Sequence, residues 1–460
     1  MVNRKICKLT LASAIGLVTF VPAAAFATNG YFSHGVSTKE KGLVGAGAAY
    51  SQDTLAAGTN PAGMVWQGNR WDAGASWFSP MREYTADGSP PGGPFAANVG
   101  AGGPNDTVNS EMEDFIIPQF GWNKMLDADS AFGVSVFGRG GMNTTWKAKD
   151  TAGGFGVFGS PAGAGGDAGV DLGQLFIMPT YSRKISNTSS WGVSAIVAYQ
   201  TFKAKGIVNF SGISIDPANL TNNDDDTSVG LGFAAGWQGE VAPGWTLGVS
   251  YQSEIKMDEF DDYAGLFAEQ GDFDIPSTWI VGLAWDVTPK SKLVVDVQKI
   301  NYTDVPSVSN PSLARLVAPG CAPGAGPGGS GAGPGCLGAD DGVGFGWDDM
   351  TVFKIGYEWA TSPDWTWRVG FSDADQPIDE DADILFNVLA PGVMEDHFTF
   401  GFTRKLGSNT ELNFAAMYAP EECIEGLSNP IPVLGGGPGT QTTELCMDQF
   451  EAALSYGKRF

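Results

Sequence analysis

The sequence is poor in three features, and each shortage excludes a class of protein. No run of 18 apolar residues occurs after residue 27, so membrane-spanning helices are excluded. Histidine is limited to His34 and His397, without an evident serine or aspartate constellation, so we predict no catalytic residues and no enzyme. Lysine and arginine number 26 against 51 acidic residues, and a chain this acidic repels nucleic acid.

The first 27 residues have the features of a secretory leader. Three lysine or arginine residues stand before residue 9, residues 9–24 are mostly apolar, and Ala25-Phe26-Ala27 forms a small-residue cleavage site. A retained membrane anchor is the alternative. We expect a cleaved signal peptide and a mature chain that begins at Thr28. Loss of the three positive charges changes the formal charge from −25 to −28.

Four cysteines follow the leader, and an even number in an exported chain predicts two disulfides. The sequence allows three connectivities. The simplest pairs Cys321 with Cys336 and Cys423 with Cys446, because each pair brackets a segment rich in glycine and proline. Metal binding is the alternative, but the thiols lack CxxC spacing and a nearby histidine. We therefore predict no metal site and no cofactor, and we read the acidic runs 224–226 and 373–383 as a solvated rim.

From residue 71 to the last residue, apolar and polar residues alternate with a period of two, as in strands with one apolar face. In one segment, Trp279, Val281 and Leu283 share a face opposite Gly282 and Ala284. The predicted strands are 71–82, 113–123, 132–145, 172–184, 191–207, 227–241, 245–257, 277–287, 292–302, 347–360, 365–372, 397–405, 410–418 and 450–460. A soluble sandwich also alternates, but bulky aromatics near strand ends favour the girdles of a membrane barrel.

The connections between these segments alternate between short and long. Residues 242–244 and 407–409 are short links, whereas 303–346 and 419–449 are long ones. Tight periplasmic turns and long extracellular loops give this pattern in an up-and-down barrel. We predict an all-β fold in which residues 68–460 form a fourteen-stranded antiparallel transmembrane β-barrel of the Gram-negative outer membrane. Both ends of the barrel are then periplasmic, and we expect the barrel assembly machinery to read the terminal Phe460.

Residues 28–67 do not follow the strand pattern. They are rich in small residues and contain the compact turn Asn60-Pro61-Ala62. We predict that this stretch folds inside the barrel as a hatch of short helices and loops.

Three motifs resemble the FadL-type family, the long-chain fatty acid and hydrocarbon transporters of Gram-negative outer membranes. They are the G-x-G-A-A-Y…N-P-A-G-M pattern of residues 45–64, the D-I-P-S-T-W of residues 274–279, and the L-A-P-G-V-x-E-D-H-F-T-F-G of residues 389–401. The resemblance covers the whole mature chain and implies a hatch-plugged barrel of fourteen strands, which matches the count made from the alternation. It also implies a monomer.

The resemblance further implies a route for apolar cargo. The cargo is captured between the third and fourth extracellular loops, binds against the N-terminus of the hatch, and leaves sideways through a gap at a kinked third strand. An apolar route is required physically, because each CH₂ group favours an apolar environment over water by about 0.8 kcal/mol.

The residues that match this route can be named. The loop candidates for cargo binding are Phe210, Ile213, Ile215, Leu220, Phe260, Tyr263, Leu266 and Phe267, which have loop packing as their alternative role. The hatch candidates are Thr28, Asn29, Gly30, Tyr31 and Phe32 as the tip that faces the cargo, and Asn60, Pro61 and Ala62 as the turn. Gly138, Gly140 and Gly141 are the candidates for the strand kink.

Family members that take fatty acids place basic side chains near the carboxylate. Arg139, Arg183, Arg368 and Lys299 are barrel residues available for that role, and an interior short of cations favours neutral hydrocarbons instead. The expected partners are outer-membrane lipid and lipopolysaccharide, hydrophobic small-molecule cargo and the assembly machinery. The alternatives to a transporter are a general porin and a structural or adhesive barrel.

Overall fold

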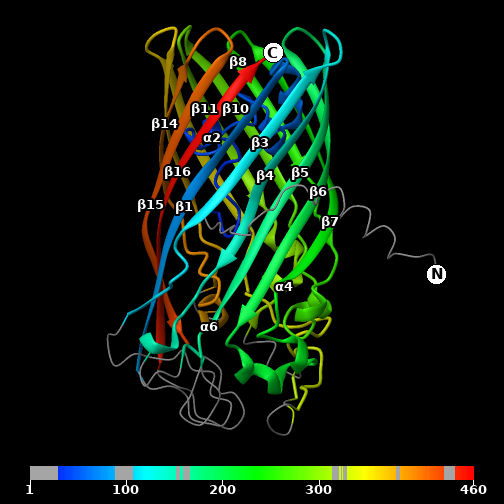
Figure 1. Cartoon of the computed structure of the whole chain (residues 1–460), viewed down its shortest axis with the longest axis vertical. Helices are drawn as coiled ribbons and strands as arrows, with labels where there is room; N and C mark the ends of the chain where they lie inside the picture. Colours follow the sequence, from blue (N-terminus) through cyan, green and yellow to red (C-terminus); the bar gives the residue numbers. More distant parts are fainter. Residues whose placement is uncertain are drawn as a thin grey trace, which may run out of the picture.

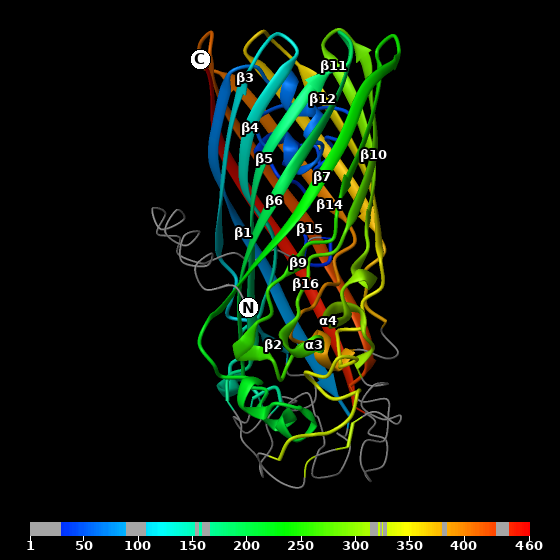
Figure 2. The same cartoon turned by 90° about the vertical axis from the view of Figure 1, so that its right-hand side faces the viewer.

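The computed structural model describes residues 29–88, 107–151, 156–158, 166–312, 321–322, 324, 329–379, 384–428 and 441–460. The predicted leader, Thr28 and part of the acidic run 373–383 lie outside the described residues. The described chain forms one long antiparallel barrel with short helices inside it and at one end (Figures 1 and 2). None of its helices is long and apolar enough to cross a membrane.

Fourteen long strands in the described residues form the barrel wall, which confirms the predicted number. They are β1 (Arg70–Asp87), β3 (Phe115–Met125), β4 (Ser130–Asn143), β5 (Gly169–Lys184), β6 (Ser189–Lys205), β7 (Asp226–Ala242), β8 (Trp245–Gln252), β10 (Thr278–Thr288), β11 (Ser291–Ile300), β12 (Met350–Ala360), β13 (Trp365–Ala374), β14 (His397–Lys405), β15 (Thr410–Leu427) and β16 (Thr442–Arg459). Each long strand pairs with its sequence neighbours, and β1 pairs with β16 from Arg70↔Arg459 to Asp87↔Thr442. This pairing closes the barrel.

The predicted strand boundaries differ from the structure by a few residues in most strands, and two predicted segments differ more. The segment 245–257 is not one strand: β8 ends at Gln252, and the short β9 (Lys256–Met257) pairs with β7. The described residues of the predicted long link 419–449 are mostly strand, because β15 and β16 continue beyond the region that alternates between apolar and polar residues. A second short strand, β2 (Val108–Asn109), pairs with β1.

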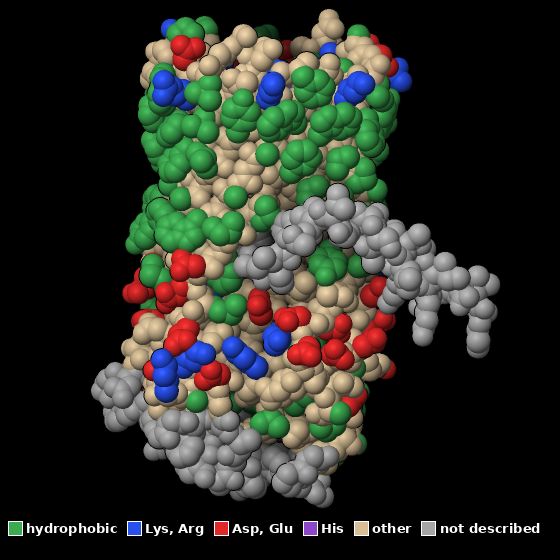
Figure 3. Space-filling model, in the orientation of Figure 1, with side chains coloured by type: hydrophobic (Ala, Val, Ile, Leu, Met, Phe, Trp, Pro, Cys, Tyr) green, Lys and Arg blue, Asp and Glu red, His purple; other side chains and the backbone are tan. Residues whose placement is uncertain are grey.

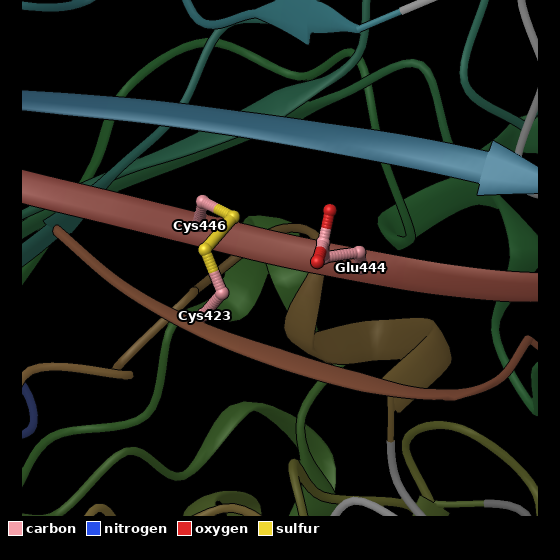
Figure 4. A group of neighbouring side chains, drawn as sticks. All are labelled: Cys423, Glu444 and Cys446. Atoms are coloured by element: carbon pink, nitrogen blue, oxygen red, sulfur yellow. A yellow bond between two sulfur atoms is a disulfide. The ribbon is translucent and has the colours of Figure 1, made fainter. Parts of the chain in front are cut away.

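Disulfides hold two places at the end with the long loops. Cys423 and Cys446 lie opposite each other on β15 and β16, and their disulfide joins the two extended strands (Figure 4). Glu444 lies beside it, but the two sulfurs are bonded to each other and offer no thiolate for a metal ion. Cys321 is bonded to Cys336 within the loop between β11 and β12. Both bonds follow the simplest pairing predicted.

The outer surface is divided into two zones. On the face that Figure 3 shows, a band of hydrophobic side chains covers the half of the barrel with the short turns, below a rim that carries some charged side chains. Acidic and basic side chains also gather toward the long loops. Exposed and half-buried aromatic residues stack on one another, as in the rings of Trp245 and Trp285, 5.0 Å apart, and of Trp365 and Trp367, 5.4 Å apart. A belt of this kind matches the lipid-facing surface of a membrane barrel.

Short helices occupy the interior and the loops. They are α2 (Thr38–Lys41), η1 (Ala56–Gly58), η2 (Pro61–Trp66), η3 (Ala148–Asp150), η5 (Val208–Ile213), η6 (Pro217–Asn219), η7 (Asp261–Tyr263), α3 (Ala268–Gly271), η8 (Tyr302–Asp304), α4 (Pro306–Ser309) and α6 (Ile384–Asn387). The first three belong to residues 29–67, which lie inside the barrel toward the end with the short turns and the C-terminus (Figures 1 and 2). We call residues 29–33 the hatch tip and residues 38–67 the hatch body.

Candidate functional site

Buried ion pairs attach the hatch body to the strands that close the barrel. Lys41 on α2 pairs with Glu451 of β16 and donates to Ser76 of β1. Lys39 pairs with Glu411 of β15, and all four charged groups of Lys39, Lys41, Glu411 and Glu451 are largely buried. Such pairs are costly to break, since separating them leaves an uncompensated charge in a low-dielectric interior. The helix α2 is therefore a fixed part of the hatch.

The turn at Asn60 is fixed by its own side chain. Asn60 caps η2 by accepting a hydrogen bond from the Ala62 amide at 3.0 Å, and it donates to the carbonyls of Ala48 and Trp237. Glycines in the wall leave room for this turn: a Cβ at Gly236 would lie 2.0 Å from Asn60 Oδ1. A short polar residue before proline is well suited to this position. Proline is tolerated at the first position of a helix, and the asparagine side chain accepts a hydrogen bond from an otherwise free amide.

Further wall residues bind the hatch backbone and side chains. Asp296 of β11 accepts hydrogen bonds from the Gly47 and Ala48 amides at 2.8 and 3.0 Å. Arg368 of β13 donates to Gln52 and pairs with Glu358 at 2.7 Å. Arg368, a candidate for carboxylate binding, is thus already occupied by the hatch and by an acid.

Glu40, in the hatch body, is buried among carboxylates. Its Oε2 accepts a hydrogen bond from Thr59, and Oε1 has no partner among the described atoms. Burial, and next the neighbouring Asp53, raise the pKa of Glu40 to about 8. The charged form of Glu40 is disfavoured inside the barrel because burial penalises a charge and the neighbouring Asp53 repels it.

The hatch tip is enclosed by aromatic rings. Tyr302 donates a hydrogen bond to the Asn29 carbonyl and accepts one from the Tyr31 amide, and its ring lies 5.1 Å from the Tyr31 ring. Gly30 has a φ of +61°, and a Cβ there would lie 2.6 Å from the Tyr302 hydroxyl. Trp347 lies 6.0 Å from Tyr31, ring to ring. The predicted tip residues from Asn29 to Phe32 are therefore brought together in one buried, largely apolar place.

The barrel wall is incomplete beside the tip. β3 pairs with β4 only as far as Gln119↔Phe137, and the β4–β5 ladder is irregular between Gly138 and Gly140. Beyond this point the hatch tip pairs with the free edge of β4: the Ser33 amide donates to the Arg139 carbonyl, and the Gly141 amide donates to the Tyr31 carbonyl. The predicted kink glycines thus lie where the wall opens and the tip covers the opening.

Two buried arginines lie near the tip without a paired acid in the described chain. The guanidinium of Arg139 lies 4.2 Å from the centre of the Phe32 ring, and its Nε has no hydrogen-bond partner. Arg82 donates to the carbonyls of Met112 and Pro80 and lines a small cavity with Gly30. Arg139 was named from the sequence as one of four cations, and Arg82 was not. The other two candidates are exposed on the outside, Arg183 unburied and Lys299 paired with Asp349.

The loop candidates pack against one another rather than line an open groove. Around Phe202 lie the rings of Phe267, Tyr263 and Phe260, at 4.6, 4.8 and 5.6 Å. We define the loop cluster by the buried residues Phe202, Phe210, Leu220, Phe260, Tyr263, Leu266 and Phe267. Ile213 and Ile215 are half-buried and pair through their backbone with Leu337 of the fifth loop. Any cargo bound among these residues must separate their side chains.

The two histidines meet where the N-terminal segment contacts the wall: His34 precedes the hatch body, and His397 is the first residue of β14. Their rings stack with centres 6.2 Å apart, His34 Nδ1 lies 3.5 Å from Glu451, and His397 Nδ1 lies 3.3 Å from the Ser372 hydroxyl. The two rings therefore add to the polar contact surface of the hatch.

The comparisons with known proteins agree with this arrangement. The family model of the outer membrane protein transport proteins (OMPP1/FadL/TodX) matches residues 15–419. The chain belongs to this family. It is accordingly a β-barrel transport protein of the Gram-negative outer membrane, and its family is not a class of enzymes.

Solved structures share the fold of this family member. The chain is similar to the P. putida toluene transporter TodX, with 18% identity and a TM-score of 0.62 over 93% of this chain and 99% of that one. It is also similar to a Pseudomonas aeruginosa FadL homologue, with 15% identity and a TM-score of 0.63 over 94% and 100% of the chains. For the Ralstonia pickettii toluene transporter TbuX the identity is 16% and the TM-score 0.59, over 93% and 99%. A search of curated proteins finds no match to the chain.

Proposed function

We propose that this protein takes up hydrophobic molecules, long-chain fatty acids or related hydrocarbons, from outside the cell. The family is one of outer-membrane transport proteins, and two of the similar structures are toluene transporters. The interior of this chain supports the same cargo class, because the hatch tip and the loop cluster belong to one buried apolar cluster. An apolar molecule can replace such contacts at little cost, whereas an ion or sugar cannot.

The hatch tip at the open edge of β4 carries the proposal. Among the described residues, only two backbone hydrogen bonds join the tip to that edge: the Ser33 amide donates to the Arg139 carbonyl, and the Gly141 amide donates to the Tyr31 carbonyl. Movement of the tip would expose the gap between β3 and β4 to the lipid. Cargo would enter among the loop cluster, bind against the tip and leave sideways into the bilayer, without crossing the polar hatch body.

The unpaired Arg139 favours a cargo with an anionic head group. A buried guanidinium without an acid is costly, and the face of Phe32 compensates it only in part. A fatty acid carboxylate placed there would supply the missing charge and accept hydrogen bonds from it. A neutral hydrocarbon would gain nothing from this side chain.

Growth on single carbon sources tests both statements. A strain that lacks this protein should grow more slowly than wild type on long-chain fatty acids, and equal growth on fatty acids, alkanes and aromatics would contradict transport.

Arg139→Gln should lower fatty acid uptake about tenfold to a hundredfold, since hydrogen bonds between charged groups stabilise by about 1.5–3 kcal/mol. Arg183→Gln, on the outer surface, is the matched control and should leave uptake unchanged. Equal losses for fatty acids and alkanes in Arg139→Gln would contradict the head-group assignment.

The hatch distinguishes a transporter from a general porin. A porin needs an open lumen, whereas here buried ion pairs hold the hatch body across the barrel. We propose that the protein acts as a monomer surrounded by lipid and lipopolysaccharide, and that the assembly machinery inserts it through its last strand.

A further inference from the structure

Residues 384–394 are a buried stretch within an extracellular loop. All eleven residues, from α6 to Met394, are buried, although they connect two strands at the rim with the long loops. Loops normally run over the surface, because buried backbone needs hydrogen-bond partners. We call residues 384–394 the inward segment.

The inward segment is held by two tryptophans. The Trp146 indole donates to the Val388 carbonyl at 3.0 Å, and the Trp347 indole donates to Asn387 Oδ1 at 2.6 Å. The Asn387 amide in turn donates to the Phe345 carbonyl at 2.8 Å. These partners come from the loops after β4 and before β12, so the segment bridges two distant sides of the barrel.

The inward segment touches both the loop cluster and the hatch tip, beside Phe273, whose ring contacts Phe267 of the cluster and Tyr31 of the tip. On one side, the ring of Phe386 lies 5.1 Å from that of Phe210 in the loop cluster. On the other side, Ala390 and Gly392 line the small cavity that Gly30 also lines. A Cβ at Gly392 would lie 3.6 Å from the Cα of Gly30, so the segment and the tip are in contact.

We infer that the inward segment is a second gate, which closes the path over the hatch tip from the extracellular side. The inference rests on the proposed function, in which cargo passes from the loop cluster to the tip. Phe386 touches the first of these places and Gly392 the second, so cargo that passes between Phe210 and Gly30 displaces the segment. The described contacts of the segment are apolar surfaces and neutral hydrogen bonds, without a salt bridge, and these are far cheaper to exchange than the ion pairs of the hatch body.

Cysteine labelling in intact cells tests the gate without any cargo. Ala390→Cys introduces a buried thiol, and the four cysteines of the described chain are already bonded in pairs. A membrane-impermeant maleimide should label it slowly. Asn387→Ala removes the hydrogen bonds of that side chain with the Trp347 indole and the Phe345 carbonyl, so it should raise the labelling rate of Ala390→Cys about tenfold.

Asn123→Ala is the matched control. Asn123 is equally buried and donates two hydrogen bonds, but to the Met64 and Gly68 carbonyls of the hatch side. It should leave the labelling of Ala390→Cys unchanged. The heat-dependent mobility of the folded barrel in gels confirms that each variant is assembled. Rapid labelling without Asn387→Ala, or equal increases in both variants, would overturn the gate.

A labelling experiment with cargo distinguishes failure of the gate from failure of the proposed transport function. Saturating oleate should raise the labelling rate of Ala390→Cys, and uptake of oleate should be measured in the same cells. Uptake without any change in labelling overturns the gate and leaves the transport proposal standing. Labelling that responds to Asn387→Ala in cells that take up neither oleate nor hexadecane supports a movable segment but contradicts the transport proposal.

Discussion

The hatch body and the loop cluster fill the two halves of one barrel, yet different forces hold them. The hatch body is bound by buried charges, such as Lys41 with Glu451 and Lys39 with Glu411. The loop cluster and the inward segment are held by rings and aliphatic side chains in mutual contact, such as Phe202 with Phe267 at 4.6 Å. Apolar contacts are non-directional and can be taken over by an apolar ligand, but a buried ion pair cannot.

This difference assigns the motion to one half. An apolar molecule that enters the loop cluster exchanges one apolar contact for another, so opening there costs little once cargo is present. Displacing the hatch body would leave several charges without partners inside the barrel. The hatch body is therefore the anchor, and the tip, the inward segment and the loops are the parts that move.

Removal of one buried charge should give the largest effect. Glu451→Ala leaves Lys41 without its acid, and we expect the hatch body to lose about 4 kcal/mol of local stability. Hydrogen exchange of the purified protein, read over residues 38–67, measures this loss. Asp225→Asn, which breaks the exposed pair with Lys203, should change stability by less than about 1 kcal/mol. Equal protection of residues 38–67 in wild type and Glu451→Ala would show that the ion pair does not anchor the hatch.

A cavity in the loop cluster should give the next largest effect, in the other half. Phe202→Ala removes a buried ring that contacts Phe260, Tyr263 and Phe267, and we expect a loss of about 3 kcal/mol. Hydrogen exchange should increase in residues 207–220 and 258–275 while residues 38–67 stay protected. Loss of protection in both halves would mean that the anchor and the moving part are not independent.

The two halves also differ in how far the sequence predicts them. Strand number and hatch position follow from local patterns, because alternation and its absence are read over a few residues. The pair of Lys41 and Glu451 joins residues 410 positions apart, and no local pattern indicates it. Whether an acid lies close enough to pair with Arg139 likewise depends on residues far away in the sequence. The inward segment does have a signal in the sequence, because the apolar run of residues 384–394 lies in a loop that is otherwise acidic.

The pH should act on the hatch body through Glu40. Its pKa is raised to about 8 in the docked hatch, from an ordinary value of 4.5, mainly by burial and next by Asp53. When the hatch body is in place inside the barrel, Glu40 holds a proton that it releases when the hatch body detaches from the wall and Glu40 meets water. Attachment of the hatch body is therefore strongest below pH 4.5 and weakens as the pH rises toward 8. The slope is at most about 1.4 kcal/mol per pH unit. Asp296 and Lys354 also act on Glu40, with opposite effects on its pKa.

Glu40→Gln separates the titration of Glu40 from the titration of every other group in the protein. Glutamine keeps the acceptor for Thr59 but binds no proton, so hydrogen exchange of residues 38–67, corrected for the intrinsic rate at each pH, should depend less on pH than in wild type. The loop cluster, read over residues 258–275, should respond equally in both proteins. A pH profile of residues 38–67 that is identical in wild type and Glu40→Gln would exclude Glu40 as its source.

The smallest effect should come from the turn that marks the hatch in the sequence. Asn60→Ala removes the cap of η2 and the hydrogen bonds to the Ala48 and Trp237 carbonyls, and we expect a loss of about 2 kcal/mol in residues 38–67. Asn69→Ala removes a single exposed contact with the Met125 amide and serves as the control, with a change below about 0.5 kcal/mol. The hydrogen-bond partners of Asn60 lie in the hatch and in β7, not in the inward segment. Its loss should therefore loosen the hatch without altering the labelling of Ala390→Cys. Faster labelling of residue 390 in Asn60→Ala would instead couple the anchor to the gate and remove the division between the two halves.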